Sequence, residues 1–152
     1  MIDVSKDFPP AFYRVTIKGM CVRDGKLLMI QEAGHHNAGN WELPGGGLDF
    51  GEDIFLGFNR ETQEEMGLSI SKISKAPIYV WTWKYENRRN LEWFHSFVVC
   101  YRIEFEHLNF TKSDECAKIQ FFSEEELKNM EHKGQMIPLP GIFKAADFEV
   151  QF

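Results

Sequence analysis

Residues 46–68 read GGLDFGEDIFLGFNRETQEEMGL, and the order of acidic and apolar side chains in this stretch decides the expected fold. The pattern favours a helix over residues 52–66, closed by the glycine that follows in the position typical of a C-cap. Glu61, Glu64 and Glu65 are spaced i, i+3 and i+4, so they share an arc of roughly 100° on that helix. The stretch therefore predicts a helix with one carboxylate face.

Apolar residues beside this face are expected to hold the helix against the core. Phe55, Phe58, Thr62 and Met66 form a stripe at helical spacing. Gly57 lies between the carboxylates, although a glycine there costs up to about 1 kcal/mol of helix propensity. We therefore expect a loop, an ion or a ligand to approach the helix closely at Gly57.

Neighbouring carboxylates on one helix face have two interpretations. On a solvated surface they repel one another by a few tenths of a kcal/mol per pair, roughly, and Ser123–Glu126 is an ordinary acidic stretch of this kind. As ligands, they supply the oxygen donors that Mg²⁺ or Mn²⁺ requires. Glu64 and Glu65 taken alone favour the solvated interpretation, so the surrounding residues must decide.

The surrounding residues favour a cation site, because residues 46–68 match the pattern G-x5-E-x7-R-E-U-x-E-E-x-G-U, in which U is a bulky aliphatic residue. Seven fixed positions, each met by about one residue in fifteen, coincide by chance about once in 10⁸ start points. Thr62 is the one departure, and it leaves every charged position intact. The matching residues are Gly46, Glu52, Arg60, Glu61, Glu64, Glu65, Gly67 and Leu68.

On these residues the chain resembles the Nudix (MutT-like) hydrolase family, and the resemblance extends to residues 41–44 (WELP) and to the flanking strands. It implies an α/β (α+β) Nudix fold, a mixed β-sheet sandwiched between helices with a loop-helix-loop motif, in a single domain over residues 1–152. It also implies Mg²⁺-dependent hydrolysis of a phosphoanhydride bond, with Mn²⁺ as a substitute cation. The substrate is expected to be a nucleoside diphosphate linked to another moiety, or a (d)NTP, attacked by water at phosphorus.

Two other functions are compatible with such a fold. A non-catalytic Nudix-like module that binds a nucleotide or a protein is the main alternative, and it predicts losses among the carboxylates of the motif. None is lost here. An isomerase or glycosyl hydrolase would need additional catalytic residues, which the sequence does not identify.

The resemblance implies a role for each charged residue of the motif. Glu64 and Glu65 are expected to be metal ligands, and Glu61 is expected to be a ligand or the general base for the attacking water. Arg60 is expected to orient Glu61. Glu52 is expected to support the site from the junction between loop and helix.

Further binding residues are expected outside the helix. Glu115, just before the last strand, is the candidate for an additional carboxylate ligand, with a solvated loop residue as the even alternative. Arg88 and Arg89, in a polar loop, are candidate donors to a distal phosphate, although solubilising loop charges are an equal alternative. Close approach of the backbone to cation and phosphate is expected at Gly45, Gly46 and Gly47.

Strand patterns surround the expected helix. Aromatic residues alternate along one expected strand (Tyr79, Trp81, Trp83 and Tyr85), where contact with the core or with a second copy in a homodimer is favoured over stacking on a nucleobase. The expected elements are a hairpin of 12–22 with 27–30 across a turn at 23–26, a second hairpin of 76–85 with 92–105, a strand at 118–122, a helix from Ser123 to about Met130 and a short helix near 142–148.

Composition limits the partners and the compartment. A net charge of −6 argues against binding DNA or RNA, whose affinity comes mainly from lysine and arginine, so a small phosphorylated metabolite is the expected substrate. No signal peptide and no apolar run of membrane length is visible. The three cysteines fit neither a disulfide framework nor a zinc site. We expect a cytoplasmic protein without membrane or nucleic-acid partners.

Overall fold

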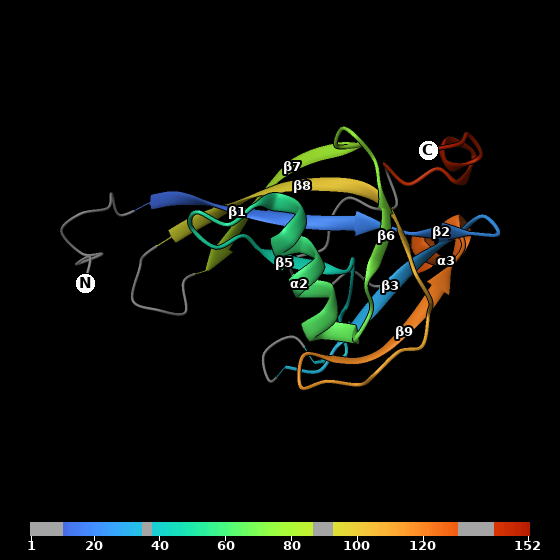
Figure 1. Ribbon diagram of the computed structural model, residues 1–152, viewed down its shortest axis with the longest axis horizontal. Helices are drawn as coiled ribbons and strands as arrows, with labels where there is room; N and C mark the ends of the chain where they lie inside the picture. The colour runs from blue at the N-terminus through green and yellow to red at the C-terminus, as the bar shows by residue number, and fades with distance from the viewer. Residues whose placement is uncertain (1–10, 35–37, 87–92, 131–141) are drawn as a thin grey trace.

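A computed structural model describes residues 11–34, 38–86, 93–130 and 142–152, and Figure 1 shows how their strands and helices are arranged. Most of the described elements are strands, with one long helix, α2, packed on them. In chain order the elements are β1 (Ala11–Met20), β2 (Val22–Arg23), β3 (Lys26–Glu32), β4 (Trp41–Glu42), β5 (Gly45–Gly47), α2 (Ile54–Met66), β6 (Ile70–Ile73), β7 (Tyr79–Glu86), β8 (Trp93–Phe105), β9 (Cys116–Phe122), α3 (Glu124–Asn129) and the 3₁₀ helix η1 (Ala145–Phe148).

The larger sheet is mixed. Its strands follow the order β5-β1-β8-β6, and β7 pairs with another part of β8. β1 runs parallel to β8 over ten residue pairs, whereas β5, β6 and β7 are antiparallel to their neighbours. The predicted hairpin of residues 76–85 with 92–105 is confirmed by β7 and β8. β6 was not predicted from the sequence, because its four residues are too short to show a period.

The smaller sheet corrects the first predicted hairpin. β2, β4 and β9 all pair with β3, and only Val22–Arg23 turn back onto it. The turn itself is confirmed, since Asp24 and Gly25 have φ angles of 50° and 73°, as a two-residue hairpin turn requires. β1 belongs to the larger sheet instead, because its long pairing with β8 satisfies more backbone N–H and C=O groups than the short pairing of Val22–Arg23 with β3 does.

Helix α2 begins and ends close to the predicted positions. It starts two residues after Glu52, because Asp53 acts as the N-cap and accepts hydrogen bonds of 3.0 Å from the backbone N–H groups of Phe55 and Leu56. Gly67 closes it in the left-handed conformation, with φ at 69°. A side chain at Gly57 would collide with the carboxylate of Glu52, so the predicted close approach at this glycine comes from a neighbouring loop.

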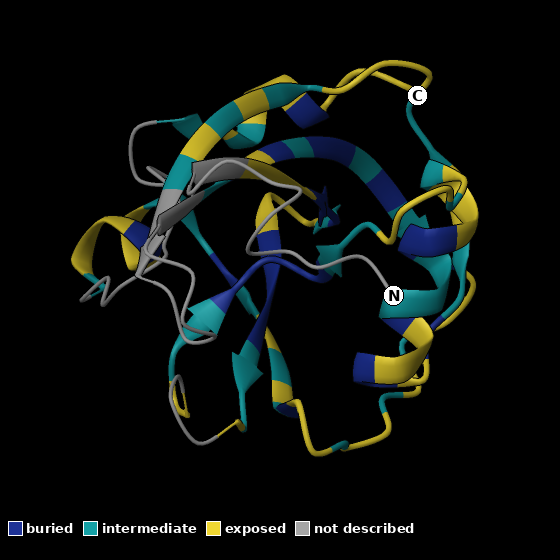
Figure 2. Cartoon of the chain, turned by 90° about the vertical axis from the view of Figure 1, so that its left-hand side faces the viewer, coloured by how far each residue is buried: buried dark blue, intermediate teal, exposed yellow. Residues whose placement is uncertain are grey.

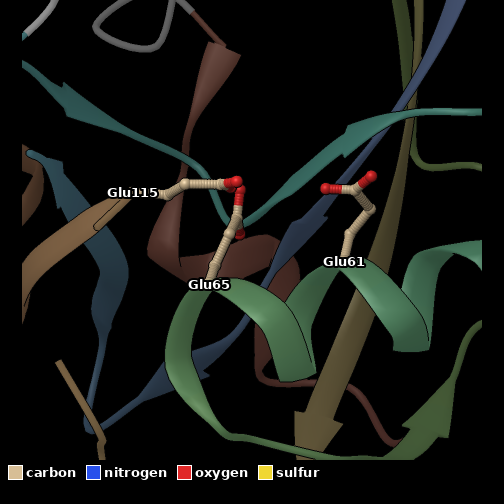
Figure 3. Close-up of side chains that lie close together, drawn as sticks. All are labelled: Glu61, Glu65 and Glu115. Carbon is tan, nitrogen blue, oxygen red and sulfur yellow. The ribbon is translucent and has the colours of Figure 1, made fainter. Parts of the chain in front are cut away.

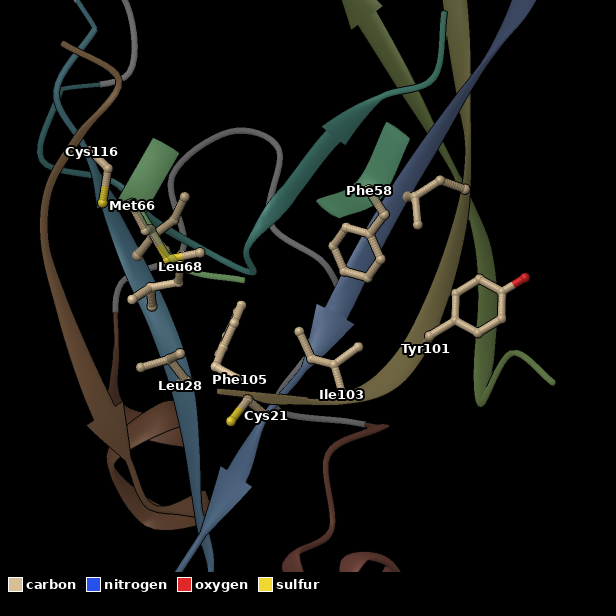
Figure 4. Close-up of a cluster of buried hydrophobic side chains, with 11 residues drawn as sticks. Cys21, Leu28, Phe58, Met66, Leu68, Tyr101, Ile103, Phe105 and Cys116 are labelled. Atoms are coloured by element: carbon tan, nitrogen blue, oxygen red, sulfur yellow. The ribbon is translucent and has the colours of Figure 1, made fainter. Parts of the chain in front are cut away.

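The inner side of α2 packs into a buried cluster that Figure 4 shows. Phe58, Thr62 and Met66 are buried as predicted, whereas Phe55 is half exposed and its ring meets the edge of Tyr101. The hydroxyl of Thr62 lies 3.0 Å from the carbonyl oxygens of Asn59 and Leu68. These acceptors satisfy the hydroxyl, which explains how a polar residue replaces the usual aliphatic one in the core.

A second buried cluster includes Met20, Leu43 and Cys100, and some of the alternating aromatic residues of β7 pack against it. Tyr79 and Trp81 pack against it, and the Tyr79 hydroxyl donates a 2.7 Å hydrogen bond to the carbonyl of Ile142. Trp83 is half-buried, and the side chain of Tyr85 lies outside the described residues. For Tyr79 and Trp81, the core interpretation is confirmed.

The last elements follow the sequence closely. The capping box of Ser123 and Glu126 is present, β9 begins two residues before the predicted strand, and the short C-terminal helix is the 3₁₀ turn η1. Buried residues gather on the central strands, and the turns between them are exposed (Figure 2). Within the described ranges, no helix is both long and apolar enough to cross a membrane.

Candidate active site

Three carboxylates from two distant parts of the chain meet beside α2. Glu61 and Glu65 project from the helix, and Glu115 reaches them from the loop before β9 (Figure 3). One oxygen of each carboxylate lies within 4.8 Å of one oxygen of the other two. Oxygen donors at this separation can share one hard divalent cation.

The loop that carries Glu115 is fastened to the end of α2 by Ser113. The Ser113 hydroxyl donates a 2.7 Å hydrogen bond to the carbonyl of Glu65 and accepts hydrogen bonds from the backbone N–H groups of Glu115 and Cys116. From the other side, the carbonyl of Glu115 accepts a 2.9 Å hydrogen bond from the N–H of Ala33. Sequence reasoning missed Ser113, although a serine just before an acidic pair is a familiar turn signal.

Glu65 is buried, with 7% of its surface exposed. Its Oε2 accepts a 3.1 Å hydrogen bond from the N–H of Gly45. Burial raises the pKa of Glu65 to about 8; Lys18 and the N–H of Gly45 oppose the rise, while Glu61 and Glu115 add to it. Without a cation, the surroundings therefore favour the protonated form of Glu65 over its carboxylate.

Lys18 is a buried cation that lowers the pKa of Glu65, and sequence reasoning did not identify it. Its ammonium donates to the carbonyl oxygens of Leu43 (3.1 Å) and Gly45 (2.9 Å) and pairs with Glu42 at 3.5 Å. Both partners of this ion pair are buried. Lys18 thus fixes the turn that leads into the glycine strand β5, and in the sequence it looked like an ordinary lysine of an alternating strand.

Arg60 connects the remaining charged residues of the motif. Its guanidinium binds both oxygens of Glu52, at 2.7 and 3.1 Å, and donates to Glu61 at 3.0 Å and to Glu64 at 3.1 Å. Glu52 also accepts from the N–H of Asp49. Arg60 lowers the pKa of Glu52, whereas burial raises the pKa of Glu61 against the opposing effect of Arg60. Arg60 thus contacts Glu52, Glu61 and Glu64 at once, and the roles expected of Arg60 and Glu52 stay predictions.

Glu64 lies apart from the acidic cluster. Its side chain is 53% exposed and pairs with Arg60, and its carboxylate is not one of the three that approach one another. Its role as a metal ligand stays a prediction. Arg88 and Arg89 lie outside the described residues, so their contact with a phosphate also stays a prediction.

The acidic cluster opens into a cavity of about 250 Å³. Gly45, Gly46 and Gly47 border it as β5, and the φ angle of 120° at Gly45 is accessible only to glycine. A Cβ at Gly46 would collide with the carboxylate of Glu61, and one at Gly47 with the guanidinium of Arg14. The cavity lining comprises Arg14, Thr16, Lys18, Glu32, Glu42, Gly45, Gly46, Gly47, Glu61, Glu65 and Glu115.

Comparison with known proteins identifies sequence relatives. The NUDIX domain family matches residues 13–139 of the chain. A MutT-like protein of Streptomyces ambofaciens is 38% identical over 71 residues, which are 46% of this chain and 44% of that protein. The chain thus matches less than half the length of this curated relative.

Solved structures show the same fold. A MutT NUDIX hydrolase from Burkholderia pseudomallei is 25% identical, with a TM-score of 0.58 over 75% of this chain and 85% of that one. The MutT protein from Methanosarcina mazei Go1 is 20% identical, with a TM-score of 0.63 over 82% of this chain and 86% of that one. These similarities confirm the predicted fold class.

Proposed function

Since the chain belongs to the Nudix/MutT hydrolase family, we propose that it is a Mg²⁺-dependent pyrophosphohydrolase. The proposed substrate is a nucleoside diphosphate linked to another moiety, or a (d)NTP, in which water attacks phosphorus and the phosphoanhydride P–O bond breaks. One observation carries the proposal: the carboxylates of Glu61, Glu65 and Glu115 lie within 4.8 Å of one another at a cavity bordered by a glycine strand.

The donor set fits a hard divalent cation. Three carboxylates supply only oxygen ligands, and the raised pKa of Glu65 marks negative charge that the protein alone leaves poorly compensated. Glu65 and Glu115 would hold Mg²⁺ or Mn²⁺, and Glu61 would be either a third ligand or the general base. When bound, such a cation screens phosphate charge and acidifies the attacking water.

The residues of the chain would divide the remaining work. Glu61 would accept the proton that the attacking water loses, because Arg60 holds its carboxylate in place and burial raises its pKa toward that of a useful base. The electron pair of the broken bond leaves with the departing phosphate. If Glu61 serves only as a ligand, Glu115 is the next candidate for the base.

Location and partners follow from the same properties. We propose a cytoplasmic enzyme of small phosphorylated metabolites, supported by three free, buried cysteines and a net charge of −6. Homodimer formation and the single-domain organisation of residues 1–152 stay predictions. Sedimentation equilibrium would test the first and limited proteolysis the second.

A substrate panel tests the proposal. Nucleotide sugars, ADP-ribose, NADH, dinucleoside polyphosphates and (d)NTPs would be incubated with Mg²⁺, with phosphate release measured with and without added phosphatase. We expect hydrolysis of at least one class and complete loss of that hydrolysis in excess EDTA. Turnover that persists in the chelator would contradict the metal mechanism, and an inactive protein across the panel would favour the non-catalytic alternative.

A further inference from the structure

Arg14 is a cation in the cavity whose charge the described part of the chain does not neutralise. Its side chain is exposed, and its guanidinium lies against Gly47, where any Cβ would collide with it. Among the described residues, no carboxylate forms an ion pair with Arg14, although five glutamates line the same cavity. Such a group is available for an anion that enters from outside.

The other cation of the lining is already occupied. The ammonium of Lys18 donates to two backbone carbonyls and pairs with Glu42, all within a buried environment. Both cations belong to β1 and, with Thr16, they lie on the same face of this strand, since alternate residues of a strand share a face. In the row formed by Arg14, Thr16 and Lys18, the side chain of Lys18 is held by buried protein groups at one end. At the other end, Arg14 faces the solvent-accessible part of the cavity.

The glycine strand β5 lies between Arg14 and the acidic cluster of Glu61, Glu65 and Glu115. Gly46 pairs with Ile17 of β1. The carboxylate of Glu61 lies against Gly46 on the face of the sheet that α2 covers. Gly47 pairs with Thr16, and the guanidinium of Arg14 lies against it on the opposite face. Because these glycines are adjacent and lack side chains, one ligand can contact both faces at this sheet edge.

We propose that Arg14 binds a second phosphoryl group of the substrate, next to the phosphoryl group that a cation at Glu61, Glu65 and Glu115 would hold. The inference rests on the proposed function, and it names the residue that selects linked phosphoryl groups over a single one. The planar guanidinium offers paired donors that match two phosphate oxygens. Gly47 takes part because a side chain at this position would make the guanidinium shift from its present place.

Binding of inorganic probes tests this role without the nucleoside. Imidodiphosphate, a diphosphate with a bridging nitrogen, and inorganic phosphate would be titrated into Mg²⁺-loaded protein by calorimetry. The variants are Arg14→Gln, Arg14→Lys and Gly47→Ala, and the matched control is Arg23→Gln, an exposed arginine of β2 outside the cavity lining. Mn²⁺ titration of each variant shows whether the acidic cluster is intact.

We expect Arg14→Gln to weaken imidodiphosphate binding by about 10-fold to 100-fold, the range for lost charge-assisted hydrogen bonds. Phosphate and Mn²⁺ affinity should change by less than about 3-fold. Arg14→Lys should fall between, since it keeps the charge but loses the fork, and Gly47→Ala, which shifts the guanidinium without removing it, should weaken binding less than Arg14→Gln.

Equal imidodiphosphate affinity in Arg14→Gln and Arg23→Gln would overturn the inference, and so would a wild type that binds imidodiphosphate no better than phosphate. If Arg14-dependent binding is present but the substrate panel shows no hydrolysis, the proposed function fails and the binding role of Arg14 remains. If hydrolysis is present without Arg14-dependent binding, the proposed function stands and the role of Arg14 fails.

Discussion

Two acidic helix segments of this chain contain the same residue type in opposite environments. On α3, Glu126 closes a capping box with Ser123 and Glu124 accepts a hydrogen bond from the N–H of Ala145. On α2, Glu61 and Glu65 point into a cavity toward Glu115. The contrast shows that clustered glutamates of one residue type can be satisfied locally near the surface or gathered at a cavity, depending on where the fold places them.

The pKa directions express the same difference. Hydrogen bonds from the backbone N–H and the side chain of Ser123 lower the pKa of Glu126. Burial raises the pKa of Glu61 and brings that of Glu65 to about 8. Local donors thus stabilise the charged form on α3, whereas burial destabilises it on α2. The energy that the second arrangement costs is recovered if a cation binds.

The largest expected effect is on kcat, which should depend on the glutamates of α2 and not on those of α3. We expect Glu61→Gln to lower kcat by about 10² to 10⁴ while Mn²⁺ binding stays near the wild-type value, because an amide cannot accept the proton. Glu65→Gln should lower both kcat and Mn²⁺ affinity, since its amide oxygen carries no formal charge. Steady-state kinetics with Mn²⁺ titration would distinguish them.

Glu125→Gln on α3 is the matched control, since this exposed glutamate lies outside the cavity lining, and it should leave kcat unchanged. Near wild-type kcat in Glu61→Gln, with the cation bound normally, would disprove the base assignment. Glu115 would then be the candidate to substitute next.

An intermediate effect concerns stability in metal-free solution. The pKa of Glu65 is higher in the folded protein than in the unfolded chain. The contribution of Glu65 to the free energy of unfolding is therefore greatest below the unfolded pKa of 4.5 and is lost as pH rises through about 8. Glu65→Gln should remove this loss while keeping an acceptor for the N–H of Gly45. Relative to wild type, the variant should gain stability between pH 5 and 9, on the order of a few kcal/mol, in urea unfolding.

Glu126→Gln should behave in the opposite way. The lowered pKa of Glu126 contributes stability above the unfolded value of 4.5, and this contribution is lost as pH falls through the folded pKa. The variant should therefore lose stability near neutral pH and match the wild type in acid. Parallel pH profiles for both variants would show that the two segments do not differ as described.

The smallest expected effect tests the local nature of α3. Ser123→Ala removes the N-cap of this helix, so we expect a loss of about 1 kcal/mol in the free energy of unfolding. None of the residues lining the cavity lies on α3, so kcat/KM should be unchanged. A parallel fall in kcat/KM would mean that α3 is coupled to the acidic cluster.

The sequence by itself determined features that depend on neighbouring residues. The spacing of residues 46–68 identified the family and the helix, Gly67 marked its end, and Ser123 with Glu126 marked the start of α3. Glu115 was proposed as an outside carboxylate from the resemblance, and the structure brings it to Glu61 and Glu65. Caps, turns and helical faces involve residues within a few positions of each other, so their signals are visible in the chain.

Only the tertiary structure decided which of the equivalent residues face the cavity. Glu64 and Glu65 are identical neighbours in sequence, but packing of α2 buries Glu65 and leaves Glu64 beside Arg60 in solvent. The antiparallel pairing of β1 with β5 likewise places Arg14 and Lys18 at the cavity beside the glycine strand. These outcomes depend on contacts between residues far apart in sequence, whose strand pairing no local pattern specifies.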